Sequence, residues 1–282
     1  MNKRIAHLLP LSALLLLLLT AALAEDAGLL SCRFFDVDKG DAMLITFPDG
    51  ARVMIDAGSN KAGKMLEKWM KAEGIDRLDA LVITHFDKDH VGGADKVLKA
   101  CSVARVVIPG YEKDSKQHAQ FLKALNGSPD TETVVLDPRE ETVISSGGAD
   151  LRISAAHLTD YGRDEENDFS LAGRLTFGET RFLFTGDAED ARQRELLSEG
   201  DVACDVLKVP YHGRAVAVSA EFLSACQPEI AWIPDGPEDK ADPGLVQYLE
   251  EKLSAAVYRS ADEGDLVVFS DGKTVWAGEA GE

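Results

Sequence analysis

Residues 84–93, with the sequence THFDKDHVGG, place four metal-competent side chains in one turn directly after the apolar run Leu81–Ile83. The apolar run is typical of a buried strand, and the glycine pair allows a tight turn into a helix expected over Ala94–Leu98. Charges of one sign crowded into such a turn repel each other strongly unless a cation is present. The segment therefore predicts a metal site between a strand and a helix, with a solvated polar loop as the alternative. The four side chains are His85, Asp87, Asp89 and His90.

Two more apolar strands end in ligand-type residues. The run Phe182–Thr185 leads into Gly186-Asp187, and Asp205–Val209 leads into Pro210-Tyr211-His212-Gly213. Because ligand groups gather at the carboxyl ends of strands in α/β sheets, Asp187 and His212 are expected to join the first cluster. The alternatives are a helix N-cap for Asp187 and a surface position for His212.

Short apolar strands alternate with amphipathic helices along the chain, in two successive halves that each begin with hairpins. This order favours two sheets packed back to back with helices outside. Strands are expected over Cys32–Val37, Ala42–Phe47, Ala51–Ala57, Leu78–Thr84, Val103–Pro109, Thr133–Leu136, Leu151–Ala155, Leu171–Phe177, Arg181–Thr185, Asp205–Val209 and Ile230–Ile233, with a final hairpin over Leu266–Trp276. Helices are expected over Gly63–Ala72, Ser115–Leu125, Glu189–Leu197, Ala220–Ala225 and Leu245–Leu253.

The first 24 residues have the pattern of a secretory signal peptide. Lys3 and Arg4 precede an apolar stretch around Leu11–Leu19, and Ala22-Leu23-Ala24 fits a small-residue cleavage site. A signal anchor is the alternative interpretation. We expect residues 25–282 to form one domain that is secreted or kept at the cell surface, without stable membrane association after cleavage.

The net charge of −19 opposes non-specific adhesion to nucleic acids or anionic lipids. Four lysines on helical spacing could form a basic face, but a solvated helix face is favoured in a chain this acidic: Lys61, Lys64, Lys68 and Lys71. Disulfides are conceivable in an exported chain, but the four cysteines lie in or beside apolar segments, which favours free buried thiols: Cys32, Cys101, Cys204 and Cys226.

The motifs together resemble one family. The order HxDxDHxGG, then TGD, then a strand ending in His-Gly is similar to the metallo-β-lactamase fold superfamily, and most closely to the extracellular hydrolase domain of ComEC-type DNA-uptake competence proteins and their secreted relatives. Further segments resemble that branch's DVGQGDA, LIDAG and NDxS motifs and its tail: Phe35–Ala42, Met54–Gly58, Glu166–Leu171, Val257–Ser260, Gly264 and Ser270–Gly272.

The resemblance implies a four-layer αββα sandwich with two divalent metal ions, zinc or manganese, that stabilise a bridging hydroxide. His85 and Asp87 would serve the first site, and Asp89, His90 and His212 the second, with Asp187 bridging. Aspartate at position 87 makes the first site richer in oxygen, which brings manganese into competition with zinc. His157 is a candidate third ligand of the first site, although a loop histidine is favoured. Asp36 and Asp41 are expected to shape the first turn and support the ligands.

The chain departs from the branch at two places. Tyr211-His212-Gly213-Arg214 stands where the branch has two histidines before Gly-Ser, and Ala241-Asp242-Pro243 where it has Gly-His-Pro. Tyr211 could hydrogen-bond a leaving oxygen and Arg214 could bind a phosphate bidentately, or both could be ordinary loop residues. We therefore assign catalytic roles to Asp89, Asp187, Tyr211 and Arg214.

The expected function is a metal-dependent hydrolase, most readily a phosphodiesterase or nuclease acting on DNA or on a phosphate-bearing surface molecule. One alternative is a metal-binding module with weak or no turnover that binds DNA or a cell-surface ligand. The other is a lactone or β-lactam hydrolase, which the acidic Asp87 disfavours. The sequence predicts no oligomeric state.

Overall fold

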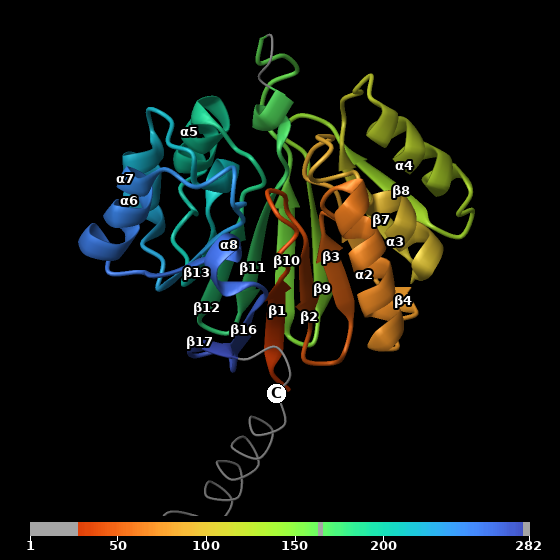
Figure 1. The fold of residues 1–282 in the computed structure, drawn as a ribbon, viewed down its shortest axis with the longest axis horizontal. Helices are drawn as coiled ribbons and strands as arrows, with labels where there is room; N and C mark the ends of the chain where they lie inside the picture. Colours follow the sequence, from red (N-terminus) through yellow and green to blue (C-terminus); the bar gives the residue numbers. More distant parts are fainter. Residues whose placement is uncertain (1–27, 163–165, 279–282) are drawn as a thin grey trace, which may run out of the picture.

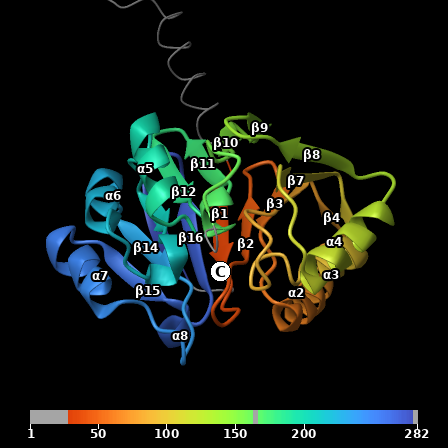
Figure 2. The ribbon, with the colours of Figure 1, turned by 90° about the horizontal axis from the view of Figure 1, so that it is seen from above.

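The computed structural model describes residues 28–162 and 166–278, and the signal peptide expected over 1–24 lies outside these residues. Two large sheets stand face to face in the centre, flanked by α2, α3 and α4 on one side and by α5, α6 and α7 on the other (Figures 1 and 2). This is the αββα sandwich that the sequence predicts, so the expected fold class is confirmed.

The first sheet has eight strands in the order β17-β16-β1-β2-β3-β5-β7-β8, and the second has seven in the order β15-β14-β13-β12-β11-β10-β9. The strands of the first sheet are β1 (Leu30–Phe34), β2 (Met43–Thr46), β3 (Arg52–Ile55), β5 (Ala80–Val82), β7 (Arg105–Pro109), β8 (Glu132–Leu136), β16 (Leu266–Ser270) and β17 (Val275–Gly278). Those of the second are β9 (Glu141–Ser146), β10 (Ala149–Ser154), β11 (Ala172–Phe177), β12 (Thr180–Phe184), β13 (Val206–Lys208), β14 (Ile230–Ile233) and β15 (Ala256–Arg259). A short pair, β4 (Arg77–Leu78) and β6 (Ser102–Val103), lies apart from both.

The helices are α2 (Asn60–Ala72), α3 (Ala94–Ala100), α4 (Lys116–Asn126), α5 (Asp190–Glu199), α6 (Ser219–Cys226), α7 (Pro243–Gln247) and α8 (Ser260–Glu263). Helix α2 shows how the sequence specifies them. Ser59 accepts a hydrogen bond from the Ala62 backbone N–H at 3.3 Å and so satisfies one of the free donors of the first turn. Leu66 and Met70 are buried, whereas the four lysines of this helix are exposed.

The main core lies between the two sheets. The ring of Phe34 on β1 packs against Phe184 on β12 and Trp232 on β14, with ring centroids 6.2 and 5.6 Å apart. All three side chains are essentially inaccessible to solvent. Aromatic contacts across the sheet interface add specific geometry to the apolar burial, which is what fixes the two sheets relative to each other.

Differences from the expected elements have simple causes. The strand β9 was not expected, because its residues alternate between exposed and half-buried and none is fully buried, as suits the edge of a sheet. The helix expected over Leu245–Leu253 starts earlier, at Pro243, and continues after Gln247 as a π-helical turn over Tyr248–Lys252. The four cysteines are free and buried, as favoured above. Among the helices of the described residues, none is long and apolar enough to cross a membrane.

Candidate metal centre

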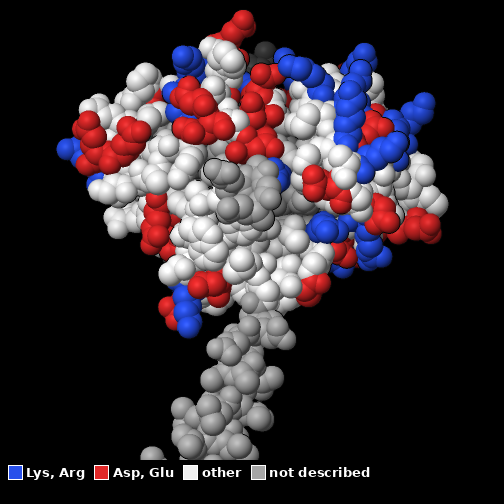
Figure 3. All heavy atoms as spheres, turned by 60° about the horizontal axis from the view of Figure 1, so that its bottom comes forward, with Lys and Arg blue, Asp and Glu red and all other residues white. Residues whose placement is uncertain are grey.

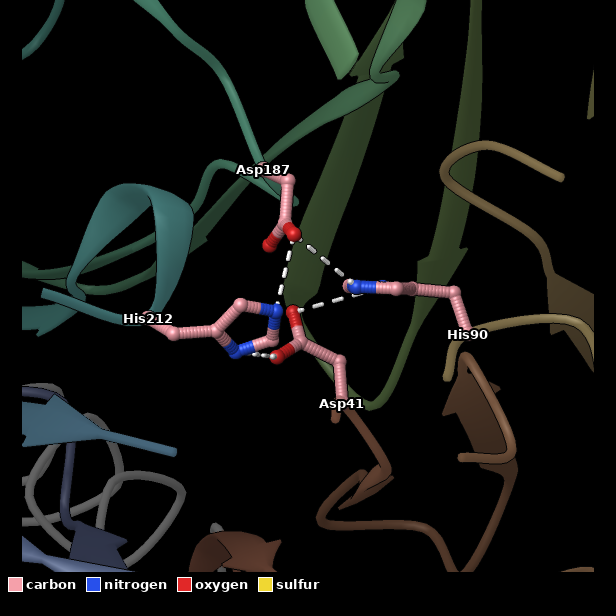
Figure 4. A group of neighbouring side chains, drawn as sticks. All are labelled: Asp41, His90, Asp187 and His212. Atoms are coloured by element: carbon pink, nitrogen blue, oxygen red, sulfur yellow. Dashed lines mark ion pairs between the residues drawn. The ribbon is translucent and has the colours of Figure 1, made fainter. Parts of the chain in front are cut away.

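Four acidic and imidazole side chains from distant parts of the chain converge where the two sheets meet. Asp41, His90, Asp187 and His212 each offer a ligand-type atom, and these atoms lie within 4.8 Å of one another (Figure 4). Asp41 precedes β2, His90 lies before α3, Asp187 follows β12 and His212 follows β13. All four are buried. The structure thus brings together Asp187, His90 and His212, which the sequence assigned to one site.

The histidines of this centre leave one ring nitrogen each without a hydrogen bond. His212 Nδ1 lies 2.9 Å from the carbonyl oxygen of Pro234, and His90 Nδ1 lies 2.9 Å from Asp56 Oδ2. Since a carbonyl or carboxylate oxygen accepts, Nδ1 is the donor in both rings and Nε2 of the neutral ring carries the lone pair. Within the described chain, Nε2 of His85, His90 and His212 is buried and has no hydrogen-bond partner.

Two of these Nε2 atoms lie close to the carboxylate of Asp187. His212 Nε2 is 2.8 Å and His90 Nε2 is 3.3 Å from Asp187 Oδ2. Buried polar atoms are normally paired, so Nε2 of His90 and of His212 beside the Asp187 carboxylate form the donor set that a divalent cation needs once it has displaced any proton from the rings. The residues present therefore fit the metal ions that the motifs imply.

His85 lies beside this cluster, with its ring centroid 4.0 Å from that of His90. Its Nδ1 is 3.1 Å from Thr84 Oγ1 and 3.4 Å from Ser170 Oγ. Burial, together with the neighbouring His90, lowers the pKa of His85 to about 4, so its imidazole is neutral at physiological pH. A neutral imidazole is the form that binds a metal.

The other buried groups titrate differently. Burial opposes a charge on His90, but the carboxylates of Asp187 and Asp41 outweigh it and hold the pKa of His90 well above its usual value. Burial likewise opposes the charge on Asp187, yet His212, His90 and Lys208 hold its pKa well below the ordinary range. In the metal-free protein, a proton on His90 and the ammonium of Lys208 thus balance the buried carboxylate.

The two aspartates of residues 84–93, here called the metal loop, face lysines. Asp87 Oδ1 accepts a hydrogen bond from Lys113 Nζ at 2.6 Å, and Asp87 is only half-buried. Asp89 Oδ2 lies 3.3 Å from Lys39 Nζ and 3.8 Å from His212 Nε2. Asp89 therefore borders the four-residue cluster, and His85 adjoins it through His90.

Asp41 lies behind the histidines. Its carboxylate is 3.8 Å from Nδ1 of both His90 and His212, and its Oδ2 is 2.7 Å from Lys208 Nζ. It therefore faces the side of each ring opposite Nε2, as a residue that supports the ligands would. Asp36 accepts a hydrogen bond from the Asp38 backbone N–H at 3.2 Å and so shapes the turn after β1.

Tight backbone positions the ligands. Gly186 has φ of +52°, and a Cβ there would lie 2.9 Å from Ser170 Oγ and 3.0 Å from Thr84 Cβ, so a side chain would push Asp187 away. Tyr211 and His212 are both in the left-handed region, with φ of 50° and 52°. Such conformations cost free energy in non-glycine residues and are concentrated at functional sites.

Several candidates lie outside the cluster. The Arg214 guanidinium stands over the Tyr211 ring at 5.4 Å and donates a hydrogen bond to Asp239 at 2.7 Å. His157 Nε2 is 3.0 Å from a Glu199 carboxylate oxygen, and neither residue belongs to the four-residue cluster. Asp187 does not cap a helix, because α5 begins at Asp190 with Glu189 in the N-cap position.

The other changed position, Asp242, has a structural role. Its carboxylate accepts a hydrogen bond from the Gly244 backbone N–H at 2.8 Å and caps α7.

Sequence reasoning assigned no role to three residues that organise the centre. Asp56 Oδ1 accepts a hydrogen bond from the Thr84 backbone N–H at 2.8 Å, and its Oδ2 accepts from the Thr84 hydroxyl at 2.6 Å and from His90 Nδ1 at 2.9 Å. Lys208 Nζ donates to the Gly186 carbonyl at 2.7 Å from inside an entirely buried strand. Ser170 accepts a hydrogen bond from the Asp187 backbone N–H at 3.1 Å. Asp56 and Lys208 could have been recognised as charged residues within or directly after apolar strands.

The surface charge is uneven although the chain is acidic. Lysine and arginine side chains gather most densely on the side of the molecule where α2, α3 and α4 lie, and acidic groups are spread over the rest of the visible face (Figure 3). The exposed lysines of α2 belong to this side.

Comparison with known proteins agrees with the geometry. The chain is 28% identical over 252 residues to ComE operon protein 3 of Bacillus subtilis, covering 82% of this chain and 32% of that protein. It is 29% identical over 206 residues to recombination protein 2 of Haemophilus influenzae, covering 71% of this chain and 24% of the relative. The chain thus spans about a third or less of these relatives.

Among solved structures, the metallo-beta-lactamase fold protein YhfI of Bacillus subtilis superposes with a TM-score of 0.57 at 15% identity, covering 88% of this chain and all of that one. This likeness concerns the fold. The sequence model of the metallo-beta-lactamase superfamily matches residues 35–234, a range that contains all six predicted ligands. With that match over most of its length, its αββα fold and its cluster of ligand atoms, this chain belongs to the metallo-beta-lactamase superfamily.

Proposed function

We propose that this protein is a metal-dependent phosphodiesterase or nuclease that holds two divalent ions and acts after export. The observation that carries the proposal is the buried cluster in which Nε2 of His90 and of His212 lies 3.3 and 2.8 Å from Asp187 Oδ2, with His85 packed against His90.

Two groups of residues would hold the ions. Asp89, His90, Asp187 and His212 form the richer group, and His85 with Asp87 forms the other, sharing Asp187. Divalent ions bound there would supply Lewis acidity and a nucleophilic water of lowered pKa. The high share of carboxylate oxygen favours manganese or zinc over softer ions, with manganese helped by Asp87.

The chain's own residues would prepare the site for this chemistry. Asp56 and the Pro234 carbonyl fix the ring orientation of His90 and His212, so that both Nε2 atoms point inward. In this proposal Tyr211 donates a hydrogen bond to the departing oxygen. Arg214 would bind a phosphate oxygen after exchanging its contact with Asp239.

A phosphodiester fits the charge of the site better than an uncharged lactone. Three cations lie beside candidate site residues: Lys39 at Asp89, Lys113 at Asp87 and Arg214 at Tyr211. A phosphodiester is a monoanion, which such cations attract. Lactones bring no charge for these cations to meet. DNA and a phosphate-bearing surface molecule both contain the required ester.

The test is a substrate panel with residues 25–282, loaded with manganese or zinc. The substrates are bis(p-nitrophenyl) phosphate, single-stranded DNA, a chromogenic lactone and a chromogenic β-lactam. We expect hydrolysis of the phosphodiesters, reduced at least about 100-fold in Asp187→Asn, because that variant loses the shared carboxylate. Turnover of the lactone or β-lactam alone would replace the proposal by acyl hydrolysis, and tight metal binding without turnover of any ester would favour a binding module.

A further inference from the structure

Each of the three carboxylates expected to bind metal has its own lysine. Lys113 Nζ is 2.6 Å from Asp87 Oδ1, Lys39 Nζ is 3.3 Å from Asp89 Oδ2, and Lys208 Nζ is 3.4 Å from Asp187 Oδ1. The three lysines differ in access to solvent. The Lys208 side chain is entirely buried, whereas those of Lys39 and Lys113 are 27% and 23% exposed.

We propose that Lys39 and Lys113 are the phosphate-binding residues of the site, holding the nonbridging oxygens of the phosphodiester from two sides. This assignment rests on the proposed function, which it deepens by naming the groups that select an anionic ester. Neither lysine is a candidate metal ligand. Lys39 lies in the loop between β1 and β2, and Lys113 lies in the loop between β7 and α4.

The position of Lys113 is fixed by a buried histidine. His118, on α4, is 4% exposed and stacks on Phe86 of the metal loop with ring centroids 4.0 Å apart. Its Nδ1 lies 2.8 Å from the Lys113 carbonyl oxygen, to which it donates. The ammonium of Lys113 also contacts Glu166, which belongs to the short helix η1 (Glu166–Phe169). Lys113 is therefore held beside Asp87 at its backbone and at its charged end.

The position of Lys39 is fixed by the turn that follows β1. The backbone N–H of Asp41 donates to the carbonyl oxygen of Asp89 at 3.1 Å, which ties this turn to the metal loop. Gly40 permits the close approach, since a Cβ there would lie 2.6 Å from the same carbonyl. Lys39 Nζ and His212 Nε2 lie 3.3 and 3.8 Å from the same oxygen of Asp89, which places the ammonium at the edge of the metal cluster.

Charge balance explains why these lysines become available. A divalent ion binds a carboxylate oxygen more strongly than an ammonium does, and a carboxylate has two oxygens. A lysine ammonium has three donors, so it can keep one bond to the aspartate and turn the others to a bound anion. With ions in place, Lys39 and Lys113 would thus keep free donors for a bound anion.

Lys208 cannot serve the same purpose. Its Nζ is enclosed by the Gly186 carbonyl oxygen, Asp41 and Asp187, at 2.7, 2.7 and 3.4 Å. No part of its side chain is exposed, so an incoming ester cannot reach it. Lys39 and Lys113 are thus the accessible lysines that bind substrate, and Lys208 is the buried lysine that stabilises the centre.

The experiment compares Lys39→Gln, Lys113→Gln and the double variant with the wild type. The matched control is Lys99→Gln, since Lys99 also pairs with an aspartate, Asp95, at 2.7 Å but is exposed on α3. Three measurements are made. Steady-state kinetics with bis(p-nitrophenyl) phosphate (KM and kcat) and the Kd of inorganic phosphate by calorimetry use metal-loaded protein, and the Kd of Mn²⁺ uses the metal-free form.

We expect each single variant to raise KM and the phosphate Kd about tenfold, the double variant more, and kcat to change less than KM. The Kd of Mn²⁺ should stay constant or fall, because a competing ammonium has been removed. Lys99→Gln should match the wild type in all three. The phosphate Kd needs no turnover, so weakened phosphate binding in the variants supports the assignment even if the wild type hydrolyses no phosphodiester.

Two results would overturn the assignment. In the first, the wild type is active and the double variant keeps the wild-type phosphate Kd and KM. The assignment of the lysines would then be wrong, whereas the proposed function would still hold. The other is a rise of the Mn²⁺ Kd that parallels the rise in KM, because the lysines would then only support the metal loop.

Discussion

Lys208 Nζ lies 2.7 Å from Asp41 Oδ2, and both side chains are fully buried. Burying a charge costs several kcal/mol unless it is paired, so this lysine and this aspartate depend on each other. Lys208 also approaches Asp187 at 3.4 Å, which links the pair to the candidate metal ligands. The centre therefore has a built-in cation that holds its carboxylates together before any ion binds.

Replacing Lys208 by methionine should destabilise the metal-free protein by about 3–5 kcal/mol, because Asp41 and Asp187 lose a buried partner. Urea unfolding in EDTA measures this difference, and saturating Mn²⁺ should reduce it. Lys61→Met is the control: Lys61 pairs with Asp38 on the surface, where solvent screens the pair, so its loss should leave the stability close to that of the wild type. Equal stabilities of the two variants would show that the buried pair is not required.

Metal affinity should fall as the pH falls through the neutral range. The pKa of His90 is raised well above its usual value, so the metal-free protein carries a proton there that an ion must displace. Affinity then rises about tenfold per pH unit up to that pKa. The pKa of His85 is lowered to about 4, so this histidine adds no dependence above about pH 5. Calorimetry of Mn²⁺ binding in buffers of different ionisation enthalpy counts the released protons, and zero protons at pH 7 would contradict this account.

Asp56→Asn should weaken metal binding about 10–100-fold without removing a ligand, because Asp56 orients His90 through Nδ1. His157→Gln should leave the affinity unchanged, since His157 pairs with Glu199. Mn²⁺ titration followed by calorimetry compares both variants with the wild type. A loss of affinity in His157→Gln equal to that in Asp56→Asn would place His157 at the centre instead.

The four thiols should resist labelling until the protein unfolds. All are buried, and burial, with Asp76 nearby, raises the pKa of Cys101 to about 11, which leaves almost no thiolate at neutral pH. We expect Ellman's reagent to react slowly with native protein and to count four thiols in denaturant. A count of two in denaturant without reductant would indicate a disulfide in the exported protein.

The sequence predicts the layers, and it predicts that His90, Asp187 and His212 lie together, because both depend on local patterns. Apolar strands that end in histidine or aspartate locate His90, Asp187 and His212, since parallel strands bring their carboxyl ends to one edge. The edge strand β9 was not predicted, because an edge strand buries too little apolar surface to show a strong pattern.

The partners of the ligands could not be predicted, since they depend on contacts between distant segments. Asp56 reaches His90 across 34 residues, and Lys113 reaches Asp87 across 26. Neither pair has a fixed spacing from which the contact can be read. Lys208 lies in the expected strand, but only the packing of the sheet reveals that its ammonium is enclosed by oxygen atoms.

The most direct test of the central claim is the rate of bis(p-nitrophenyl) phosphate hydrolysis as Mn²⁺ is titrated into metal-free protein. The account predicts no rate without metal, a rise that saturates near two ions per chain, and no rise in Asp187→Asn. A wild-type rate that stays at zero with manganese and then with zinc, or a rate unaffected by Asp187→Asn, would contradict it.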